Sequence, residues 1–264
     1  MTHGVIDRLG ERIRSGAEDP SRSAELQASR REHNAPMAEL QERLREVGID
    51  STGRIKSPER IGTKLVRQPT LRLSQMQDIA GLRHVGLPGI AAQEELARRL
   101  MATFDASIDN LLFDPRFGYR AVHVIVRRDG FLVEVQLRTN DQNEWAQLME
   151  QLADACDPAI QYGAEPAFPL AKTVARDLAA LSRSILELEF NDQFNRSMDT
   201  VNGALLDAAS SIAAQDPKWL AEVQRLEASM AAAQERQEVL RAQVSEATTK
   251  IAPAIQSLIV GGCH

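Results

Sequence analysis

The chain has 264 residues, of which 43% are hydrophobic and 26% charged, and its formal net charge is −6. This apolar share can build a sizeable core, which excludes a wholly disordered chain. The negative charge argues against a protein whose main work is coating nucleic acid, although it leaves room for a local basic pocket. At this length we expect one main domain with helical flanks.

Two further features bear on the cell compartment. The sequence has no apolar run long enough to cross a membrane, and the N-terminus lacks the apolar block of a signal peptide. Cys156 and Cys263 lie far apart without CxxC spacing, which we interpret as excluding a disulfide scaffold or a cysteine-rich zinc site. We therefore expect a soluble, cytoplasmic protein that does not contact the membrane.

The N-terminal part predicts a flexible lead-in followed by helices. Residues 1–23 are polar and form the expected lead-in. Residues 24–47 predict helix with a break near Asn34, which can cap a second segment that Pro36 opens. Gly48 is a plausible end for this segment. Its apolar stripe consists of Met37, Leu40, Leu44 and Val47.

The next stretch alternates between loop, strand and helix signals. Residues 53–68 read GRIKSPERIGTKLVRQ and are rich in glycine, serine and basic side chains. Residues 77–87, QDIAGLRHVGL, predict a buried strand. Residues 91–101 predict a helix with Leu96 and Leu100 on its apolar side.

The strongest secondary-structure signal is the segment YRAVHVIVRRDGFLVEVQLRT at 119–139. Asp129-Gly130 predicts a two-residue hairpin turn, which pairs His123 with Gln136. One face of the hairpin is then apolar and predicts core: Val122, Val124, Val126, Val133, Val135 and Leu137. The other face is polar: Tyr119, His123, Glu134, Gln136 and Arg138. Because that second face is too rich in functional groups for a buried sheet, we interpret it as a site.

The C-terminal part, residues 168–264, predicts a helical region. Before it, Trp145, Leu148, Met149 and Leu152 form one helical stripe. Residues 217–248 keep a heptad spacing, and Asp216-Pro217 is a good helix start. This helix either packs on its own domain or forms a short coiled coil between copies, and a homo-oligomer is the expected state.

Basic residues gather in the glycine-containing segment that begins at Gly53. They and one hydroxyl are Arg54, Lys56, Ser57, Lys64 and Arg67. Cationic side chains next to flexible backbone are what a polyphosphate requires. The alternative is a solvated basic helix face. No GxxxxGK[ST] motif is present, which excludes a P-loop.

Two acids on different predicted strands, Asp78 and Glu134, are the usual protein share of a nucleotide-bound Mg²⁺. Taken separately, each is more often a surface acid, and Glu134 is the stronger candidate because it shares its face with other polar side chains. Tyr119 can stack on a base or serve as a structural strand-edge residue. His123 alone would be interpreted as a hydrogen-bonded structural histidine. Strict alternation puts Asp78 and Arg83 on opposite faces, so that strand must end, bend or bulge near Gly81.

Four motifs occur in order: RIKSPERIGTK, QDIAGLR, GYRAVH, and VEVQLRT followed by WA. Together, over about residues 50–155, they resemble the synthetase domain of the RelA/SpoT family. The resemblance implies an α+β fold, with a mixed, partly antiparallel sheet wrapped by helices, as in nucleotidyltransferases. The domain is expected over residues 24–160, followed by the helical extension.

The resemblance also implies a role for each site residue. The ATP-binding set would be Arg54 and Arg83 on the adenine, with Lys56, Ser57 and Lys64 on the phosphates. Asp78 and Glu134 would be the catalytic pair and coordinate Mg²⁺, and Glu134 would assist deprotonation of the attacking hydroxyl. The acceptor side would consist of Tyr119, His123, Gln136 and Arg138.

The implied reaction moves the β,γ-pyrophosphate of ATP to the ribose 3′-hydroxyl of GDP or GTP, giving an alarmone and AMP. Two departures from the family pattern matter. The segment DPRFGYR has Phe117 where asparagine is expected, and Arg116 alone remains of a basic run. None of the five histidines belongs to the His-Asp pair of the family's hydrolase domain, and no such domain fits upstream, so we expect no hydrolase activity.

Two other functions are consistent with the sequence. Toxin-type relatives imply a different acceptor, either the 3′ end of tRNA or an adenine nucleotide, together with an antitoxin protein as partner. The changed loop before Tyr119 favours this alternative, whereas the net charge of −6 does not. A nucleotide-binding module without turnover is the third hypothesis. The complete metal pair and phosphate-binding set argue against it.

Overall fold

The structure is a computed structural model that describes residues 2–16, 20–213 and 217–263. The chain forms two compact units. Unit 1 consists of Met1–Leu87, Gln93–Leu111 and Ala121–Arg138. Unit 2 consists of Pro88–Ala92, Leu112–Arg120 and Thr139–His264. The loop with Tyr119 and the helix after residue 139 therefore group with the C-terminal helices, whereas the sequence predicted a domain over residues 24–160 that contained both.

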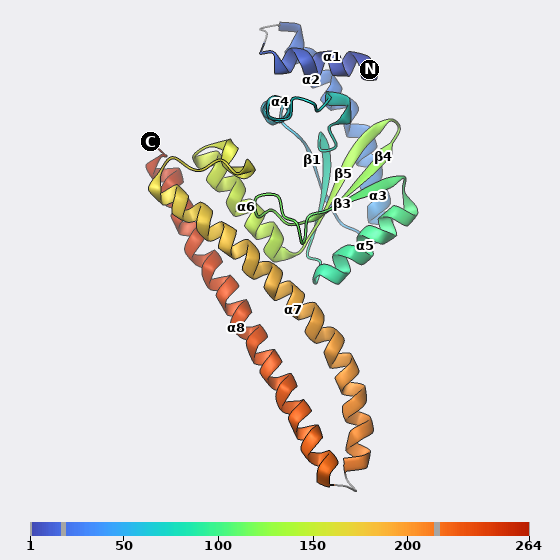
Figure 1. Cartoon of the computed structure of the whole chain (residues 1–264). Helices are drawn as coiled ribbons and strands as arrows, with labels where there is room; N and C mark the ends of the chain where they lie inside the picture. The colour runs from blue at the N-terminus through green and yellow to red at the C-terminus, as the bar shows by residue number, and fades with distance from the viewer. Residues whose placement is uncertain (1, 17–19, 214–216, 264) are drawn as a thin grey trace. The chain divides into compact units, whose positions relative to one another are not determined.

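Unit 1 contains a five-stranded sheet in the order β1-β2-β5-β4-β3. Figure 1 labels β1, β3, β4 and β5 of this sheet. The strands are β1 (Thr52–Ile55), β2 (Ala80–Val85), β3 (Ala106–Asn110), β4 (Val122–Arg128) and β5 (Phe131–Arg138). β2 and β5 are parallel, and the other neighbouring pairs are antiparallel. The expected α+β class with a mixed, partly antiparallel sheet is confirmed.

The predicted β4–β5 hairpin is confirmed in register. Asp129 and Gly130 have φ values of 50° and 81°, as a two-residue turn of this kind requires. Val126 lies opposite Val133, and His123 lies opposite Gln136. The predicted core face is buried, with each side chain at most 1% exposed: Val122, Val124, Val126, Val133, Val135 and Leu137.

Helices accompany the sheet in unit 1, and the helix Asn34–Glu46 covers its apolar face. The helical segments are α1 (His3–Arg14), α2 (Pro20–Glu32), α3 (Asn34–Glu46), α4 (Pro58–Arg67), η1 (Leu73–Gln75) and α5 (Ile90–Thr103). α3 packs against β1, β2 and β5. A Cβ built on Gly53 would meet Met37 of α3 at 3.2 Å and Leu82 of β2 at 3.6 Å, so α3 lies on the face that carries Leu82. The opposite face carries the polar side chains His123, Glu134 and Gln136.

Some N-terminal expectations need correction. The lead-in over residues 1–23 is not wholly flexible, because residues 3–14 form α1 and bury Ile6 and Leu9 in a cluster with α2 and α4. The helix break falls at His33, and Gly48 ends α3 with a φ of 80°. Val47 is 53% exposed and therefore lies outside the core. The strands β1 and β3 carried no alternation strong enough to predict them.

Unit 2 is helical. Its elements are α6 (Asn140–Ala155), η2 (Pro158–Tyr162), α7 (Pro169–Ala213) and α8 (Pro217–Gly261). The predicted stripe of α6, including Trp145 and Leu152, packs in one core with α7 and α8. Gln237 of α8 donates a hydrogen bond to Leu188 O of α7 at 3.1 Å, so the heptad helix packs on its own chain. Within the described ranges, no helix is long and apolar enough to cross a membrane.

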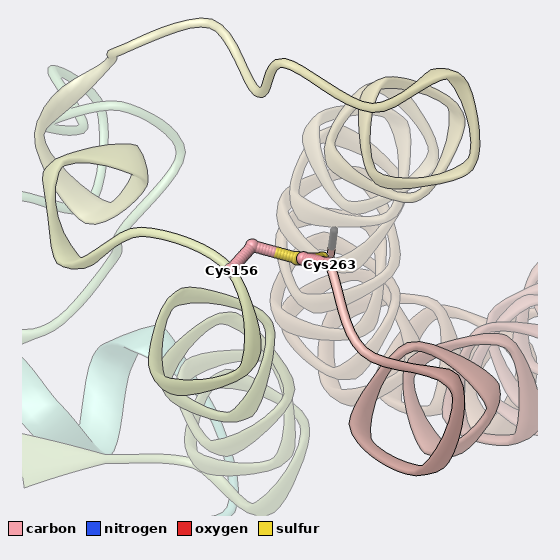
Figure 2. Close-up of a disulfide and its surroundings, with 2 residues drawn as sticks. All are labelled: Cys156 and Cys263. Atoms are coloured by element: carbon pink, nitrogen blue, oxygen red, sulfur yellow. A yellow bond between two sulfur atoms is a disulfide. The ribbon is translucent and has the colours of Figure 1, made fainter.

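A disulfide joins Cys156, which follows α6, to Cys263, which follows α8 (Figure 2). The two Cα atoms are 5.2 Å apart although the residues are separated by 107 positions. The cysteine spacing excluded a disulfide scaffold and did not predict this single disulfide. The reason is that the antiparallel α7–α8 hairpin returns the chain to its starting point, so sequence distance does not limit approach (Figure 1).

Candidate active site

The polar face of the sheet in unit 1 is built by strand register. Residues directly opposite each other on neighbouring strands point to the same face of a sheet. One row across the sheet contains Arg54, Gly81 and Glu134. The next row contains Arg83, Gln136 and His123. Gly81 contributes no side chain to the first row, and a Cβ built on it would first meet the backbone oxygens of Glu134 at 3.8 Å and Arg54 at 3.9 Å.

The orientation of Asp78 relative to Arg83 follows from where β2 begins. The strand starts at Ala80, so Asp78 lies before it and is not bound by alternation. The predicted alternation required this strand to end, bend or bulge near Gly81, and the strand limit falls between Asp78 and Gly81. Asp78 instead accepts hydrogen bonds from Lys56 Nζ at 2.7 Å and from Lys64 Nζ at 2.8 Å. The structure therefore brings one predicted metal ligand together with two predicted phosphate-binding lysines.

The charge state of Asp78 is set by these two ammonium groups. Burial alone would raise the pKa of Asp78, but Lys56 and Lys64 outweigh it and lower the pKa to about 2. Asp78 is therefore ionised at neutral pH. The lysine side chains are only 11% and 20% exposed, so they do not form a solvated basic helix face.

The two lysines come from elements that meet at the start of α4. The Lys56 backbone N–H donates to Ile79 O at 2.8 Å, which joins the end of β1 to the segment just before β2. Ser57 is the N-cap of α4, and its hydroxyl accepts from Arg60 N at 3.3 Å. Lys64 lies on the same helix. A capped helix N-terminus beside two lysines offers both N–H donors and positive charge to phosphate groups.

Glu134 is the buried centre of a chain of polar side chains. His123 Nδ1 lies 3.0 Å from Glu134 Oε1, and Gln136 Nε2 donates to Oε2 at 2.6 Å. Arg138 Nη2 in turn donates to Gln136 Oε1 at 2.9 Å. Burial raises the pKa of Glu134, and the negative charge of Asp78 raises it further. The charge and hydrogen bond of His123 and the hydrogen bond from Gln136 outweigh both effects, so the pKa is lowered. Glu134 is thus an ionised carboxylate with fixed oxygens.

Tyr119 differs from the other predicted acceptor residues in its position. β4 begins at Val122, so Tyr119 precedes the strand and the predicted alternation does not extend to it. It belongs to unit 2, where it is half-buried against the helical core. Its backbone N–H closes a turn by donating to Arg116 O at 3.0 Å. The sheet-face residues His123, Gln136 and Arg138 belong to unit 1.

Sequence reasoning missed a buried polar cluster in unit 2. Glu189 of α7 accepts hydrogen bonds from Thr139 Oγ1 and from Gln142 Nε2, and burial raises its pKa to about 7. Arg120 and Ser182 form a second buried group. The T-x-x-Q capping box at Thr139 and Gln142 was a readable signal. No spacing signal links Arg120 to a serine 62 positions away.

Comparison with known proteins bears on this arrangement. Residues 53–153 match the family described as the region found in RelA / SpoT proteins, and the matched span contains every predicted site residue. A relative from Mycobacterium tuberculosis, the uncharacterised protein Rv1366, is 31% identical over 226 residues, which cover 83% of this chain and 76% of the relative. The chain belongs to the RelA/SpoT family. This membership supports a nucleotide-binding synthetase of the pyrophosphotransferase type.

Other similar proteins add little detail to this RelA/SpoT assignment. The uncharacterised Mycobacterium bovis protein Mb1401 matches with the same identity and coverage. Small alarmone synthetase 1 from Bacillus subtilis, known from a crystal structure, shares 22% sequence identity with this chain. The structural match has a TM-score of 0.46 and covers 67% of this chain and 97% of that one. The same enzyme bound to AMPCPP is 20% identical, with a TM-score of 0.42 over 63% and 94%.

Proposed function

We propose that this RelA/SpoT protein is an ATP-dependent pyrophosphokinase that transfers the β,γ-pyrophosphate of ATP to the ribose 3′-hydroxyl of GDP or GTP. The observation that carries the proposal is the arrangement in unit 1. Lys56 and Lys64 converge on Asp78, and the electrostatic influence of Asp78 reaches an ionised, hydrogen-bonded Glu134. Positive charge for a polyphosphate and a fixed carboxylate for a hydroxyl proton are the two needs of this reaction.

The donor nucleotide would lie along the polar sheet face. Arg54 and Arg83, on neighbouring rows of that face, supply planar guanidinium groups that can stack on and clamp an adenine. Lys56, Lys64 and the N-terminus of α4 would hold the phosphates. Ser57 caps that N-terminus, so its proposed contribution to phosphate binding includes the orientation of the helix start.

Asp78 and Glu134 fit a Mg²⁺ ion as carboxylate donors. Both are ionised, and the charge of Asp78 acts on the pKa of Glu134, so the two groups lie in one electrostatic neighbourhood. Among the described residues no cluster of three or more His, Cys, Asp or Glu could hold a metal. This agrees with an ion that takes its other ligands from phosphates and water. When bound, such an ion would neutralise charge on the transferred group.

Transfer requires the acceptor 3′-oxygen to attack the β-phosphorus of ATP. The bond between that phosphorus and the oxygen bridging to the α-phosphate breaks, and AMP leaves. The hydroxyl proton passes to Glu134, whose carboxylate is held by His123 and Gln136. General-base assistance of this kind contributes about 10²–10⁴-fold to a rate. We propose synthesis alone for this chain, without hydrolysis of the product.

The acceptor would be held by Gln136, His123 and Arg138 through polar contacts and by Tyr119 through stacking on its base. One observation favours a second acceptor class. Phe117, two residues before Tyr119, is 59% exposed and has a φ of 55°. Phe117 and Tyr119 are therefore two aromatic residues close together in sequence on the same loop. Such a pair can stack successive bases of a single strand, as at the 3′ end of tRNA, and can also accept an adenine nucleotide.

Macromolecular partners and a cytoplasmic location also belong to this proposal. α7 exposes a stripe of large apolar side chains at helical spacing: Phe190, Phe194, Met198, Val201 and Leu205. An exposed apolar stripe supports contact with another chain. We propose a second copy of this protein as that chain, with a protein antitoxin as the alternative. Light scattering of the purified protein over a range of concentrations tests the homo-oligomer.

The reaction is tested with ATP labelled at the γ-phosphate, incubated with Mg²⁺ and purified protein. Separate reactions contain GDP or GTP, ATP alone, or deacylated tRNA. We expect label to appear on the guanine nucleotide, with AMP formed in equal amount. Label on tRNA alone, or on an adenine nucleotide alone, would replace the proposed acceptor with that one. Absence of transfer to any acceptor would leave a non-catalytic nucleotide-binding module as the function of this chain.

A further inference from the structure

The loop Leu112–Arg120, which carries Tyr119, is fastened to α7 inside unit 2. Ser182 of α7 donates its hydroxyl proton to Gly118 O at 2.6 Å. The same hydroxyl oxygen accepts from Arg120 Nε at 3.1 Å. One serine on α7 therefore binds the residue before Tyr119 and the residue after it. Ser182 is only 2% exposed; its hydrogen bond with Arg120 is buried, and its hydrogen bond with Gly118 is partly buried.

Arg120 extends this fastening to the start of the loop. Its Nε also lies 3.2 Å from Ser182 O, and its Nη1 donates to Leu112 O. Arg120 is 7% exposed, and a buried guanidinium of this kind is costly unless its donors are satisfied. The two ends of the loop are thus joined to each other and to α7 by one side chain. We call Arg120, Ser182 and their bonds to Gly118 and Leu112 the loop clasp.

Trp145 of α6 supports the clasp by contacting both α7 and the loop. Trp145 Nε1 donates to Leu178 O, one turn before Ser182 on α7, at 2.6 Å. The Trp145 ring also lies against Gly118. Tyr119 itself is packed on the core formed by α6, α7 and α8. Hydrogen bonds to Ser182 therefore hold the residues on both sides of Tyr119, whereas Tyr119 itself is half-buried.

We infer that Ser182 and Arg120 are positioning residues for the acceptor site, acting through Tyr119. The inference rests on the proposed function, because it assigns to Tyr119 the role of stacking on the acceptor base. Ser182 lies outside the matched RelA/SpoT region of residues 53–153. α7 is then more than a buttress of unit 2, since it fixes the loop that recognises the second substrate. The hydrogen bonds of the clasp join residues of unit 2, whereas the lysines that would hold ATP belong to unit 1, so we assign its effect to acceptor use.

The physical reason is that stacking depends on ring position. A small displacement of a positioning group can cost about a hundredfold in rate when two substrates must be aligned. Loops are held less well than helices, and functional loop residues need support from groups that are themselves locked by packing. Ser182 meets that condition, because α7 packs along α6 and α8 at this level.

The test compares Ser182→Ala with Ser184→Ala, which makes the same change two positions along α7 at a half-buried serine outside the clasp. Arg120→Lys is the second clasp variant, since it keeps the charge but cannot reach both loop ends with a planar fork. Tyr119→Ala is the reference for loss of stacking. Two measurements are made on each full-length protein: hydrogen exchange of peptides covering residues 112–120, and KM for ATP and for the acceptor.

We expect Ser182→Ala and Arg120→Lys to speed exchange in residues 112–120 and to raise the acceptor KM on the order of tenfold, the effect of losing a buried hydrogen bond. The ATP KM should stay within about twofold, as in Tyr119→Ala, and Ser184→Ala should match the parent protein. Unchanged hydrogen exchange of residues 112–120 in both clasp variants would overturn the inference that Ser182 and Arg120 hold this loop in place. Equal rises in both KM values would overturn its assignment to the acceptor. If the parent protein transfers no label to any acceptor, the proposed function fails on that assay, and the exchange data alone decide the clasp.

Discussion

Gly118 lies close against the indole ring of Trp145: a Cβ built on Gly118 would come within 2.9 Å of Trp145 Cζ2. Gly118 also has a φ of 88°, a left-handed conformation that disfavours other residues. Gly118→Ala therefore combines backbone strain with overpacking. We expect it to lower the free energy of unfolding by about 2–4 kcal/mol and to impair acceptor use, measured by thermal unfolding and acceptor KM.

Gly130→Ala is the matched control for this substitution. Gly130 has a φ of 81°, but a Cβ there would meet no atom within 4 Å. It should therefore show the backbone cost of about 1–2 kcal/mol without the clash. Equal destabilisation by the two variants would contradict the role of the Trp145 contact.

Glu134→Gln tests the proposed base. The amide keeps the size of the side chain and can still hydrogen-bond within the sheet face, but it cannot accept a proton at neutral pH. We expect transfer to fall by about 10²–10⁴-fold while the protein stays folded, checked by circular dichroism and the labelled-ATP assay. Glu95→Gln, an exposed acid on α5, should have no effect. Retained transfer in Glu134→Gln would refute the role of Glu134.

Lys64→Met tests the donor side of the site. Asp78 keeps Lys56 as a partner in this variant, so the ion pair is weakened but not abolished. With one phosphate-binding cation removed, we expect the ATP KM to rise on the order of tenfold and the acceptor KM to change little. Lys172→Met, which removes an exposed lysine on α7, is the matched control. A rise in the acceptor KM alone would show that Lys64 had been assigned to the wrong nucleotide.

Glu189 predicts a pH dependence of stability in unit 2. Its pKa is raised from 4.5 to about 7, first by burial, while Thr139 and Gln142 oppose the shift. Between these two values the folded chain binds more protons than the unfolded chain, so stability falls as pH rises through that window. The contribution of Glu189 to the free energy of unfolding is lost completely above about pH 7, and this loss amounts to roughly 3 kcal/mol.

Glu189→Gln should remove this dependence, because the amide does not titrate. Denaturant unfolding at pH 5 and pH 8 measures the difference. The parent protein should lose stability between the two, and the variant should lose less. Glu187→Gln changes an exposed residue on the same helix and should keep the slope of the parent protein. A slope in Glu189→Gln equal to that of the parent would contradict the assignment.

The Cys156–Cys263 disulfide closes a loop over a sequence separation of 107 residues. Cross-linking so long a loop restricts the unfolded chain, and we expect reduction to lower the free energy of unfolding by roughly 3–5 kcal/mol. Denaturant unfolding with and without dithiothreitol measures this. Cys156→Ser should match the reduced protein and should not respond to the reductant. A reductant effect that persists in the variant would show that it acts elsewhere.

Local signals along the chain determine a large part of the fold. The Asp129-Gly130 turn and the period-two alternation set the β4–β5 register, because a two-residue turn permits only one pairing. Helical spacing of apolar residues likewise located the buried stripe of α6. The ordered motifs from Arg54 to Arg138 indicated the family. In each case neighbouring residues carried the information, so no tertiary contact was needed to interpret it.

Tertiary structure decided how these pieces meet. β1 and β3 are short strands whose side chains are mostly exposed, so pairing partners rather than periodicity define them. The two lysines on Asp78, the clasp between Arg120 and Ser182, and the Cys156–Cys263 bond each join residues from different elements. Their energy comes from burial and geometry at close range, which spacing along the chain does not encode. The sequence by itself determined the chemical groups and their faces, and only packing decided which groups touch.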